Sequence, residues 1–138
     1  MTKKPVNLTN QELVTNYDAA VVLVNATAKT QNVAVPAGKR WFLQGGLATN
    51  GDDVNRTLTI SITNGTNIIG YIQQATTLNA GATVVYPNTL ADANHLIFPP
   101  GGFPMDPTWQ IRFVWATGGA STGGNSTITA IVYQTTYV

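Results

Sequence analysis

Two segments of the chain alternate between two kinds of side chain. Over residues 55–63 the aliphatic residues Leu58, Ile60 and Ile62 alternate strictly with four hydroxyl residues, Thr57, Thr59, Ser61 and Thr63. Residues 109–115 alternate again, with Trp109, Ile111, Phe113 and Trp115 on one face and Gln110, Arg112 and Val114 on the other. Successive side chains of a strand point to opposite faces, so both segments predict strands with one buried face.

Shorter apolar or β-branched runs between turn residues predict the remaining strands. They cover residues 19–24, 32–35, 40–44, 68–72, 83–86, 96–98 and 126–138. Gly45 and Gly46 are expected to end the strand at 40–44, and residues 99–104 and 118–125 are expected to be loops. No segment carries a helical period longer than one turn.

The spacing of these segments predicts an all-β domain. About eight strands, separated by turn signals every ~8–12 residues, are typical of an antiparallel sandwich or a small barrel. A chain of 138 residues suits one domain. We expect residues 19–138 to form a β-sandwich domain. Residues 1–18 lack a clear period and are interpreted as an N-terminal arm or an edge strand.

Composition excludes several classes of function. Charged residues make up 9% of the chain and the net charge is +1, while 43% of the residues are hydrophobic. Disorder goes with low hydrophobicity and high net charge, and non-specific nucleic-acid binding goes with a strong positive charge, so neither is expected. Because Cys is absent, a disulfide scaffold, a thiol nucleophile and a Cys-ligated zinc are excluded.

Thr, Asn and Gly take the place of the missing charge. A branched Thr side chain suits an exposed strand face, and a surface with few long charged side chains loses little rotamer entropy on burial. Such a surface suits contact with another protein, and its edge strands lack the usual defence by Lys. The alternative is a monomer whose edge strands are short and twisted.

The sequence offers no evident targeting segment. The basic start at residues 1–4 is followed by a polar segment, and the apolar run at 19–24 is shorter than the ~7–15 residues of a signal-peptide core. Nothing approaches the ~20 apolar residues of a membrane span. We therefore expect synthesis in the cytoplasm and no membrane partner.

Residues capable of catalysis are few and isolated. His95 is the single His and Glu12 is the single Glu, and neither has an evident partner. Ser61, Ser121 and Ser126 lie in strand or loop contexts without a nucleophile-elbow motif. The sequence therefore predicts no catalytic residue, no cofactor-binding residue and no enzymatic activity.

One short cluster is rich in side-chain oxygens, which are the ligands that Ca²⁺ prefers. It consists of Asn50, Asp52, Asp53 and Asn55. Its spacing does not match an EF-hand loop, so a hydrogen-bonded turn is the favoured interpretation and no metal site is predicted. Asp92 and Asp106 are isolated in loops. Asn-X-Ser/Thr sequons are expected by chance in a chain this rich in Asn and Thr; they begin at Asn7, Asn25, Asn55, Asn64 and Asn125.

The three Trp residues differ in their surroundings. Trp41 and Trp115 lie in apolar strands and are expected in the core. Trp109 opens its strand beside Pro107 and Thr108, where an exposed indole could stack on a sugar ring. Packing in the core or in an interface is the favoured interpretation for all three.

Several short motifs occur in an order that resembles a known group of proteins. Residues 35–41 (VPAGKRW) open a strand, residues 55–62 (NRTLTISI) follow an Asp/Asn turn, and residues 98–102 (FPPGG) precede a strand that begins with Trp109. The chain then ends in a long Thr/Val/Tyr strand. Over residues 33–138 this order resembles small β-sandwich virion proteins of tailed bacteriophages, in particular head decoration (cement) proteins. The segment before residue 33 carries no matching motif.

The resemblance implies a jelly-roll-like β-sandwich that binds the outside of an assembled icosahedral capsid. Such proteins commonly form trimers where copies of the major capsid protein meet, and they hold the shell against internal pressure. The implied partner is the major capsid protein, and the implied location is the capsid surface of the virion. No catalytic or contact residue carries over. The arm at 1–18 is expected to extend over an adjacent subunit.

Two other classes remain as alternatives. One is a carbohydrate- or receptor-binding module of a phage tail or fibre, with a site formed by Trp109 and the loop tips 99–107 and 118–125. The other is a different head or tail component of a virion. An enzyme ranks last, because the chain lacks paired carboxylates or a nucleophile with a base.

Overall fold

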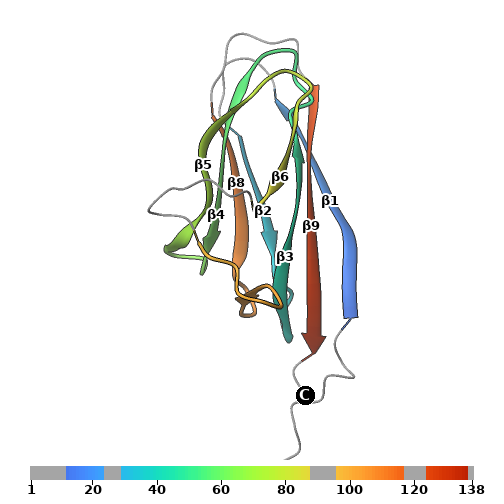
Figure 1. Ribbon diagram of the computed structural model, residues 1–138, viewed down its shortest axis with the longest axis vertical. Helices are drawn as coiled ribbons and strands as arrows, with labels where there is room; N and C mark the ends of the chain where they lie inside the picture. The colour runs from blue at the N-terminus through green and yellow to red at the C-terminus, as the bar shows by residue number, and fades with distance from the viewer. Residues whose placement is uncertain (1–11, 24–28, 88–95, 117–123, 137–138) are drawn as a thin grey trace, which may run out of the picture.

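The structure is a computed structural model that describes residues 12–23, 29–87, 96–116 and 124–136. Its nine strands form two facing antiparallel sheets (Figure 1). Sheet A contains, in order, β1 (Glu12–Leu23), β9 (Gly124–Thr136), β3 (Lys39–Thr49) and β6 (Thr83–Tyr86), and the short β7 (Phe103–Met105) also pairs with β3. Sheet B contains β2 (Lys29–Ala34), β8 (Gln110–Ala116), β4 (Arg56–Thr63) and β5 (Ile68–Leu78). The described segments include no helix of the length and apolarity that crossing a bilayer would need.

The pairing of the strands is that of a jelly roll. Strands from the first half of the chain pair in order with strands from the second half: β1 with β9, β2 with β8, β3 with β6, and β4 with β5. Folding this long double ribbon over places β9 beside β3 and β8 beside β4, which completes two four-stranded layers. Double-layered Greek-key sandwiches of this kind are jelly rolls. The expected all-β antiparallel sandwich is confirmed.

The core lies between the two sheets and follows the alternation in the sequence. In β4 and β8 the alternate apolar residues are fully buried, namely Leu58, Ile60, Ile62, Ile111, Phe113 and Trp115. Trp41 and Leu43 of β3 face them from sheet A and are equally buried. Trp41 and Trp115 are therefore core residues, as expected, and each indole N–H donates to a Gln side chain, Gln134 and Gln31 respectively.

Gly45 and Gly46 do not end the third strand, and that prediction is wrong. β3 continues through both glycines to Thr49, with a bulge between Leu43 and Gly45 that shifts the register against β9. Gly45 has a φ of 141°, which side chains rarely adopt. A Cβ on Gly46 would overlap the backbone oxygen of Thr129 and the hydroxyl of Tyr86. These glycines mark a bulge and a close contact inside a strand, not its end.

The strand expected at 96–98 is also wrong, and a strand lies a few residues later. Residues 96–98 are irregular, although the N–H of Leu96 donates to the oxygen of Tyr71. β7 instead forms within the segment expected to be a proline-rich loop, and Pro104 lies opposite Phe42 of β3. A proline lacks a backbone donor, so it is tolerated in a short edge strand of this kind.

The N-terminal part of the description begins with an edge strand. β1 starts at Glu12, so residues 12–18 pair with β9 and the boundary expected after residue 18 falls inside a strand. Residues 1–11 of the expected arm lie outside the described residues, as do residues 118–123 of the last expected loop. The long C-terminal strand expected at 126–138 is β9, described from Gly124 to Thr136.

Candidate interaction surfaces

Of the side chains that were weighed for catalysis, Ser61 and Ser126 lie in different sheets of the described part. Ser61 and Ser126 are buried in β4 and β9, and the Ser126 hydroxyl accepts a hydrogen bond from the N–H of Gly51. Glu12 is the first residue of β1. His95, Ser121 and Asp92 lie outside the described residues. Within the described segments no three His, Cys, Asp or Glu residues gather in a metal-binding group.

The oxygen-rich cluster forms a hydrogen-bonded turn between β3 and β4, which is the interpretation favoured from the sequence. The buried Asn50 donates from Nδ2 to the oxygens of Val54 and Leu78, and its Oδ1 accepts from the N–H of Asp52. Asn55 accepts from the N–H of Ala80 in the turn before β6. These bonds tie two turns together at one end of the sandwich.

The same turn contains a buried ion pair that sequence analysis missed. Nη2 of Arg56 lies 2.7 Å from Oδ2 of Asp52, and both side chains are 0% exposed. Nε of Arg56 donates to the same oxygen at 2.8 Å. The available signal was an Asp and an Arg four residues apart across a predicted turn, in a chain with little charge. The pair closes the turn, with two nitrogens of the Arg56 guanidinium directed at Oδ2 of Asp52.

Trp109 does not project as an exposed sugar-stacking platform. Its side chain is partly buried and packs against the core, and its backbone bonds to Asp106 and Val35. Residues 99–107 lie at the end of the sandwich where β8 begins. Residues 118–123 of the other expected loop tip lie outside the described residues.

The outer face of sheet A carries apolar and hydroxyl side chains, and we call it the sheet A face. Its outward rows run across β6, β3 and β9, with Val85 and Leu47 opposite Thr129, and Thr83 and Thr49 opposite Thr127. Val85 is 62% exposed and Leu47 is 42% exposed. Nearer the other end of β3 the row comprises Pro104, Phe42 and Tyr133.

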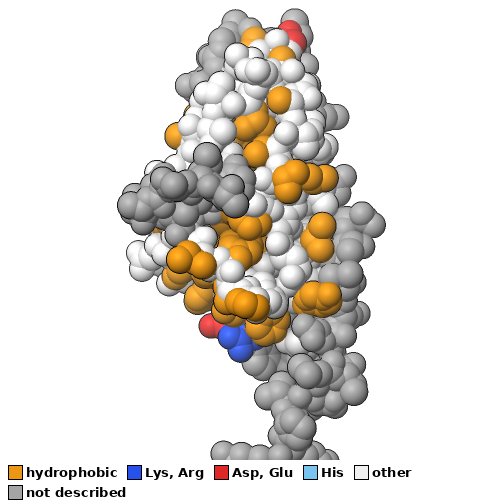
Figure 2. Space-filling model, in the orientation of Figure 1, with side chains coloured by type: hydrophobic (Ala, Val, Ile, Leu, Met, Phe, Trp, Pro, Cys, Tyr) orange, Lys and Arg blue, Asp and Glu red, His pale blue; other side chains and the backbone are white. Residues whose placement is uncertain are grey.

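Charge is sparse in these rows of β6, β3 and β9, and the register places Asp18 of the neighbouring β1 opposite Thr129. Arg40 lies over the ring of Phe42 at 5.3 Å, with its Nε 3.7 Å from Oδ1 of Asp106. The hydroxyls of Thr49 and Thr83 form a hydrogen bond to each other, with 2.7 Å between the two oxygens. These two side chains present methyl groups and neutral oxygens, not charges. In the view of Figure 2, hydrophobic side chains are scattered over the surface of the described part, and Lys, Arg, Asp and Glu side chains appear only towards its two ends.

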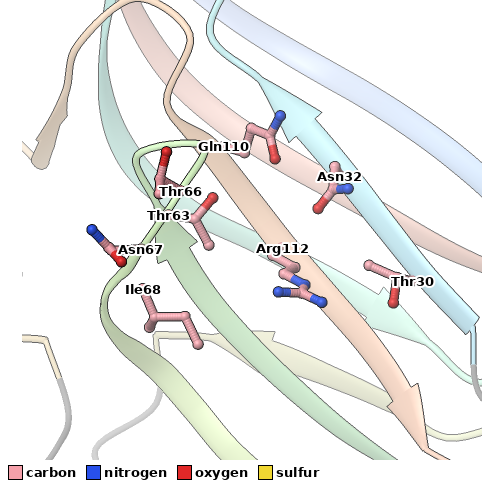
Figure 3. Close-up of a pocket in the computed structure, with 9 residues that line it drawn as sticks. Thr30, Asn32, Thr63, Thr66, Asn67, Ile68, Gln110 and Arg112 are labelled. Carbon is pink, nitrogen blue, oxygen red and sulfur yellow. The ribbon is translucent and has the colours of Figure 1, made fainter.

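The outer face of sheet B is polar and is hollowed by a depression of about 290 Å³. Its walls come from β2, β8, the end of β4 and the turn that leads into β5 (Figure 3). Asn32, Arg112 and Ser61 occupy one register row across three strands, and Gln110 lies opposite Thr63 in the next outward row. The sequence placed Gln110 and Arg112 on the polar side of their strand, which is confirmed, but it did not indicate the depression.

The pKa of Tyr86 is clearly shifted. Its ring is buried edge-on against Phe113, and its hydroxyl donates to the backbone oxygen of Thr129. Burial raises the pKa of Tyr86 above its ordinary value, because the phenolate form would lose its hydration. The hydroxyl connects β6 to β9 across β3.

Comparison with known proteins leaves the family open. No family model matches the chain, and no curated protein matches it. One solved structure, described as "Structure of infectious bursal disease virus Gx strain", is similar with a TM-score of 0.41 and 12% sequence identity. The match covers 89% of this chain and 34% of that chain, so this protein spans about a third of the other's length. The class that the fold itself defines is an antiparallel jelly-roll sandwich.

Proposed function

We propose that this protein is a structural virion protein that binds the outer surface of a bacteriophage capsid and stabilises it as a decoration (cement) protein. The observation that carries the proposal is the sheet A face. There Val85 and Leu47 are exposed between neutral Thr side chains on a rigid jelly-roll layer. The order of motifs along the sequence, which resembles that of phage decoration proteins, supports the same role.

The sheet A face suits docking onto a protein shell for physical reasons. Burial of exposed aliphatic side chains is favourable, at roughly 25 cal/mol per Å² of apolar area. Thr side chains lose little rotamer entropy on burial, and few charges have to be desolvated. A stable contact is expected to bury ~1,600 Å² in total, which several rows of this face together with neighbouring loops would supply.

The stabilising effect follows from linkage. A protein that binds the assembled shell and not its separated subunits lowers the free energy of the assembled state, by an amount set by concentration and affinity. The proposed partner is the major capsid protein, the proposed location is the capsid surface, and the proposed oligomer is a trimer. In this role the protein needs no catalytic residue, cofactor or metal, and it contacts neither nucleic acid nor membrane.

The proposal is tested by measuring the solution mass of the purified protein, followed by sedimentation with expanded phage capsids that lack their decoration protein. We expect a trimer that sediments with the shells and raises their melting temperature. Protein that remains in the supernatant at every concentration would overturn the decoration function. A monomer that nevertheless sediments with shells would remove the trimer and keep the shell contact.

The arm is a separate part of the proposal. Residues 12–18 belong to β1, so only residues 1–11 can extend over an adjacent capsid subunit without opening sheet A. Deletion of residues 1–11 is expected to weaken shell binding while the melting temperature of the free protein stays unchanged. Equal shell binding by the full chain and the shortened chain would show that the arm makes no contact.

A further inference from the structure

The depression on sheet B holds one cation without an anionic partner. Among the described residues the guanidinium of Arg112 forms no ion pair and no hydrogen bond. The strands β2, β8, β4 and β5 contain no Asp or Glu at all. Arg56, the other Arg of this sheet, is buried against Asp52. Lys29 of β2 lies opposite the inward-facing Trp115. Among the described residues of sheet B, the outward rows therefore carry only the positive charge of Arg112, which a monoanion would neutralise.

Neutral hydrogen-bonding groups surround this cation. Figure 3 shows the Arg112 side chain between Thr30 and Asn32 of β2 on one side, and Thr63, Asn67 and Ile68 on the other. The side chains of Thr30, Asn32, Thr63 and Gln110 form no hydrogen bond within the described part of the chain. An amide side chain offers both a donor and an acceptor, and a hydroxyl offers both as well. The walls thus match a ligand that carries several hydroxyl groups.

The size of the depression and its lining residues limit the class of ligand further. A depression of about 290 Å³ lies at the small end of the ~300–1,000 Å³ typical of ligand sites, so it accepts one sugar-sized unit. None of the described residues that line it is aromatic, which disfavours stacking of a nucleobase. Ile68 is 45% exposed and offers an aliphatic surface to the C–H face of a ring. A phosphate monoester carries a charge of about −1.5 to −2, more than one Arg can neutralise, whereas a carboxylate matches it.

We propose that this depression binds an acidic saccharide, with Arg112 paired to the sugar carboxylate and Asn32, Gln110 and the Thr side chains bonded to the sugar hydroxyls. A guanidinium accommodates a carboxylate through two parallel N–H···O bonds, which fixes the orientation of the sugar. The site lies on sheet B, the layer opposite the sheet A face, so it goes beyond the proposed capsid contact and does not depend on it.

The test uses a pair of ligands that differ at one carbon. Methyl β-glucuronide and methyl β-glucoside are titrated into the full-length protein, and backbone amide shifts are recorded by NMR. We expect the glucuronide to bind in the millimolar range and to shift amides of β2, β8 and the turn before β5. The glucoside is expected to bind at least ~10-fold more weakly, because it lacks the charge-assisted bonds to Arg112. N-acetylglycine and inorganic phosphate serve as probes for a peptide carboxylate and for an unspecific anion.

Substitutions separate the roles of charge and hydroxyl recognition. Arg112→Gln is expected to weaken glucuronide binding by at least ~10-fold, whereas Arg40→Gln, the matched change on sheet A, leaves it unaltered. Asn32→Ala is expected to weaken binding of the glucuronide more than binding of N-acetylglycine. Circular dichroism confirms that each variant is folded.

Four outcomes would overturn the acidic-sugar site. They are no shift with the glucuronide, equal affinity for glucuronide and glucoside, unchanged affinity in Arg112→Gln, and affinity for N-acetylglycine or phosphate as high as for the glucuronide. None of them bears on shell binding, which is measured separately by sedimentation.

Discussion

Asp52 and Arg56 form a buried ion pair in a chain that has few charged residues. Replacement of Asp52 by Asn would keep the shape of the turn and leave the Arg56 guanidinium without its anion, 0% exposed. We expect Asp52→Asn to lower the free energy of unfolding by about 3–5 kcal/mol, measured by urea denaturation. The double variant Asp52→Asn with Arg56→Met is expected to recover part of this loss, because no unpaired charge remains.

Asp106→Asn is the matched control for this substitution. Asp106 faces Arg40 at 3.7 Å, but both side chains are substantially exposed. A surface pair of this kind contributes about 0–1 kcal/mol, so the control variant should unfold close to the unsubstituted protein. Similar losses of unfolding free energy in the two variants would mean that burial does not make the Asp52–Arg56 pair more important for stability than the exposed pair.

Tyr86 gives a pH dependence whose sign follows from its burial. The unfolded chain loses the Tyr86 proton near pH 10, whereas the folded protein keeps it to higher pH because burial raises the pKa of Tyr86. Above about pH 10 the unfolded state is therefore favoured by deprotonation, and this group alone removes up to ~1.4 kcal/mol of stability per pH unit.

Tyr86→Phe isolates that contribution. At pH 8 the variant is expected to be less stable by about 1 kcal/mol, because the hydrogen bond to the oxygen of Thr129 is lost. On raising the pH through about 11 the gap should narrow or reverse, since Phe does not ionise. Urea denaturation of both proteins across this range provides the measurement. Parallel pH curves would contradict the assignment of the effect to Tyr86.

At the scale of the element, β3 depends on one glycine for its contact with β6 and β9. A methyl group at Gly46 would overlap the backbone of Thr129, which belongs to a central strand and cannot move freely. We expect Gly46→Ala to lower the free energy of unfolding by about 3 kcal/mol or more, at the upper end of overpacking effects. Thermal unfolding followed by circular dichroism measures the loss.

Gly38→Ala distinguishes crowding from backbone strain. A Cβ at Gly38 would meet nothing within 4 Å, although its φ of +73° favours glycine. Only the conformational cost, about 1 kcal/mol, is expected there. A loss at Gly46 no larger than that at Gly38 would show that β3 tolerates a side chain at Gly46.

The elements that could be predicted from the sequence are strands that bury one face and expose the other. In β4 and β8 the inward residues, such as Leu58 and Phe113, are apolar and their neighbours are polar, so the sequence alone indicates the strand and its orientation. β7 and the second half of β3 were missed because Pro104 and Gly45 are turn residues by local preference. Their pairing partners lie far away in the chain, and pairing outweighs local preference.

The depression on sheet B could not be predicted, because it exists only through register. Asn32, Arg112 and Ser61 are far apart in sequence and become neighbours when β2 and β4 pair with the two edges of β8. A shift of one residue in either pairing would turn Asn32 or Ser61 to the opposite face. The sequence indicates which side of each strand is polar. Which polar sides become neighbours depends on how the strands pair in the sheet.

At the scale of the whole molecule, the two outer faces of the sandwich point in opposite directions and differ in chemistry. The sheet A face carries apolar and hydroxyl side chains, whereas the sheet B face holds the unpaired guanidinium of Arg112 among amide and hydroxyl side chains. A protein docked to a shell through sheet A would present sheet B to the surrounding medium. The two proposals are therefore geometrically compatible, and each can fail without the other.

The sheet A face makes a prediction that separates it from other exposed apolar residues. Val85 and Ile97 are both exposed aliphatic residues, 62% and 86% respectively, but only Val85 lies on β6 in a row with Leu47. Val85→Lys would place a charge in the proposed contact, where its desolvation opposes docking. We expect at least ~10-fold weaker binding to expanded shells, measured by co-sedimentation.

Ile97→Lys is the matched control for this substitution, because it adds the same charge outside the sheet A face. We expect it to bind shells as the unsubstituted protein does, since an exposed Lys away from the contact costs little. Both variants should keep their melting temperatures, because neither side chain is part of the core. If Ile97→Lys loses binding to shells and Val85→Lys does not, the protein docks through the region around residue 97. The sheet A face is then the exposed side of the bound molecule.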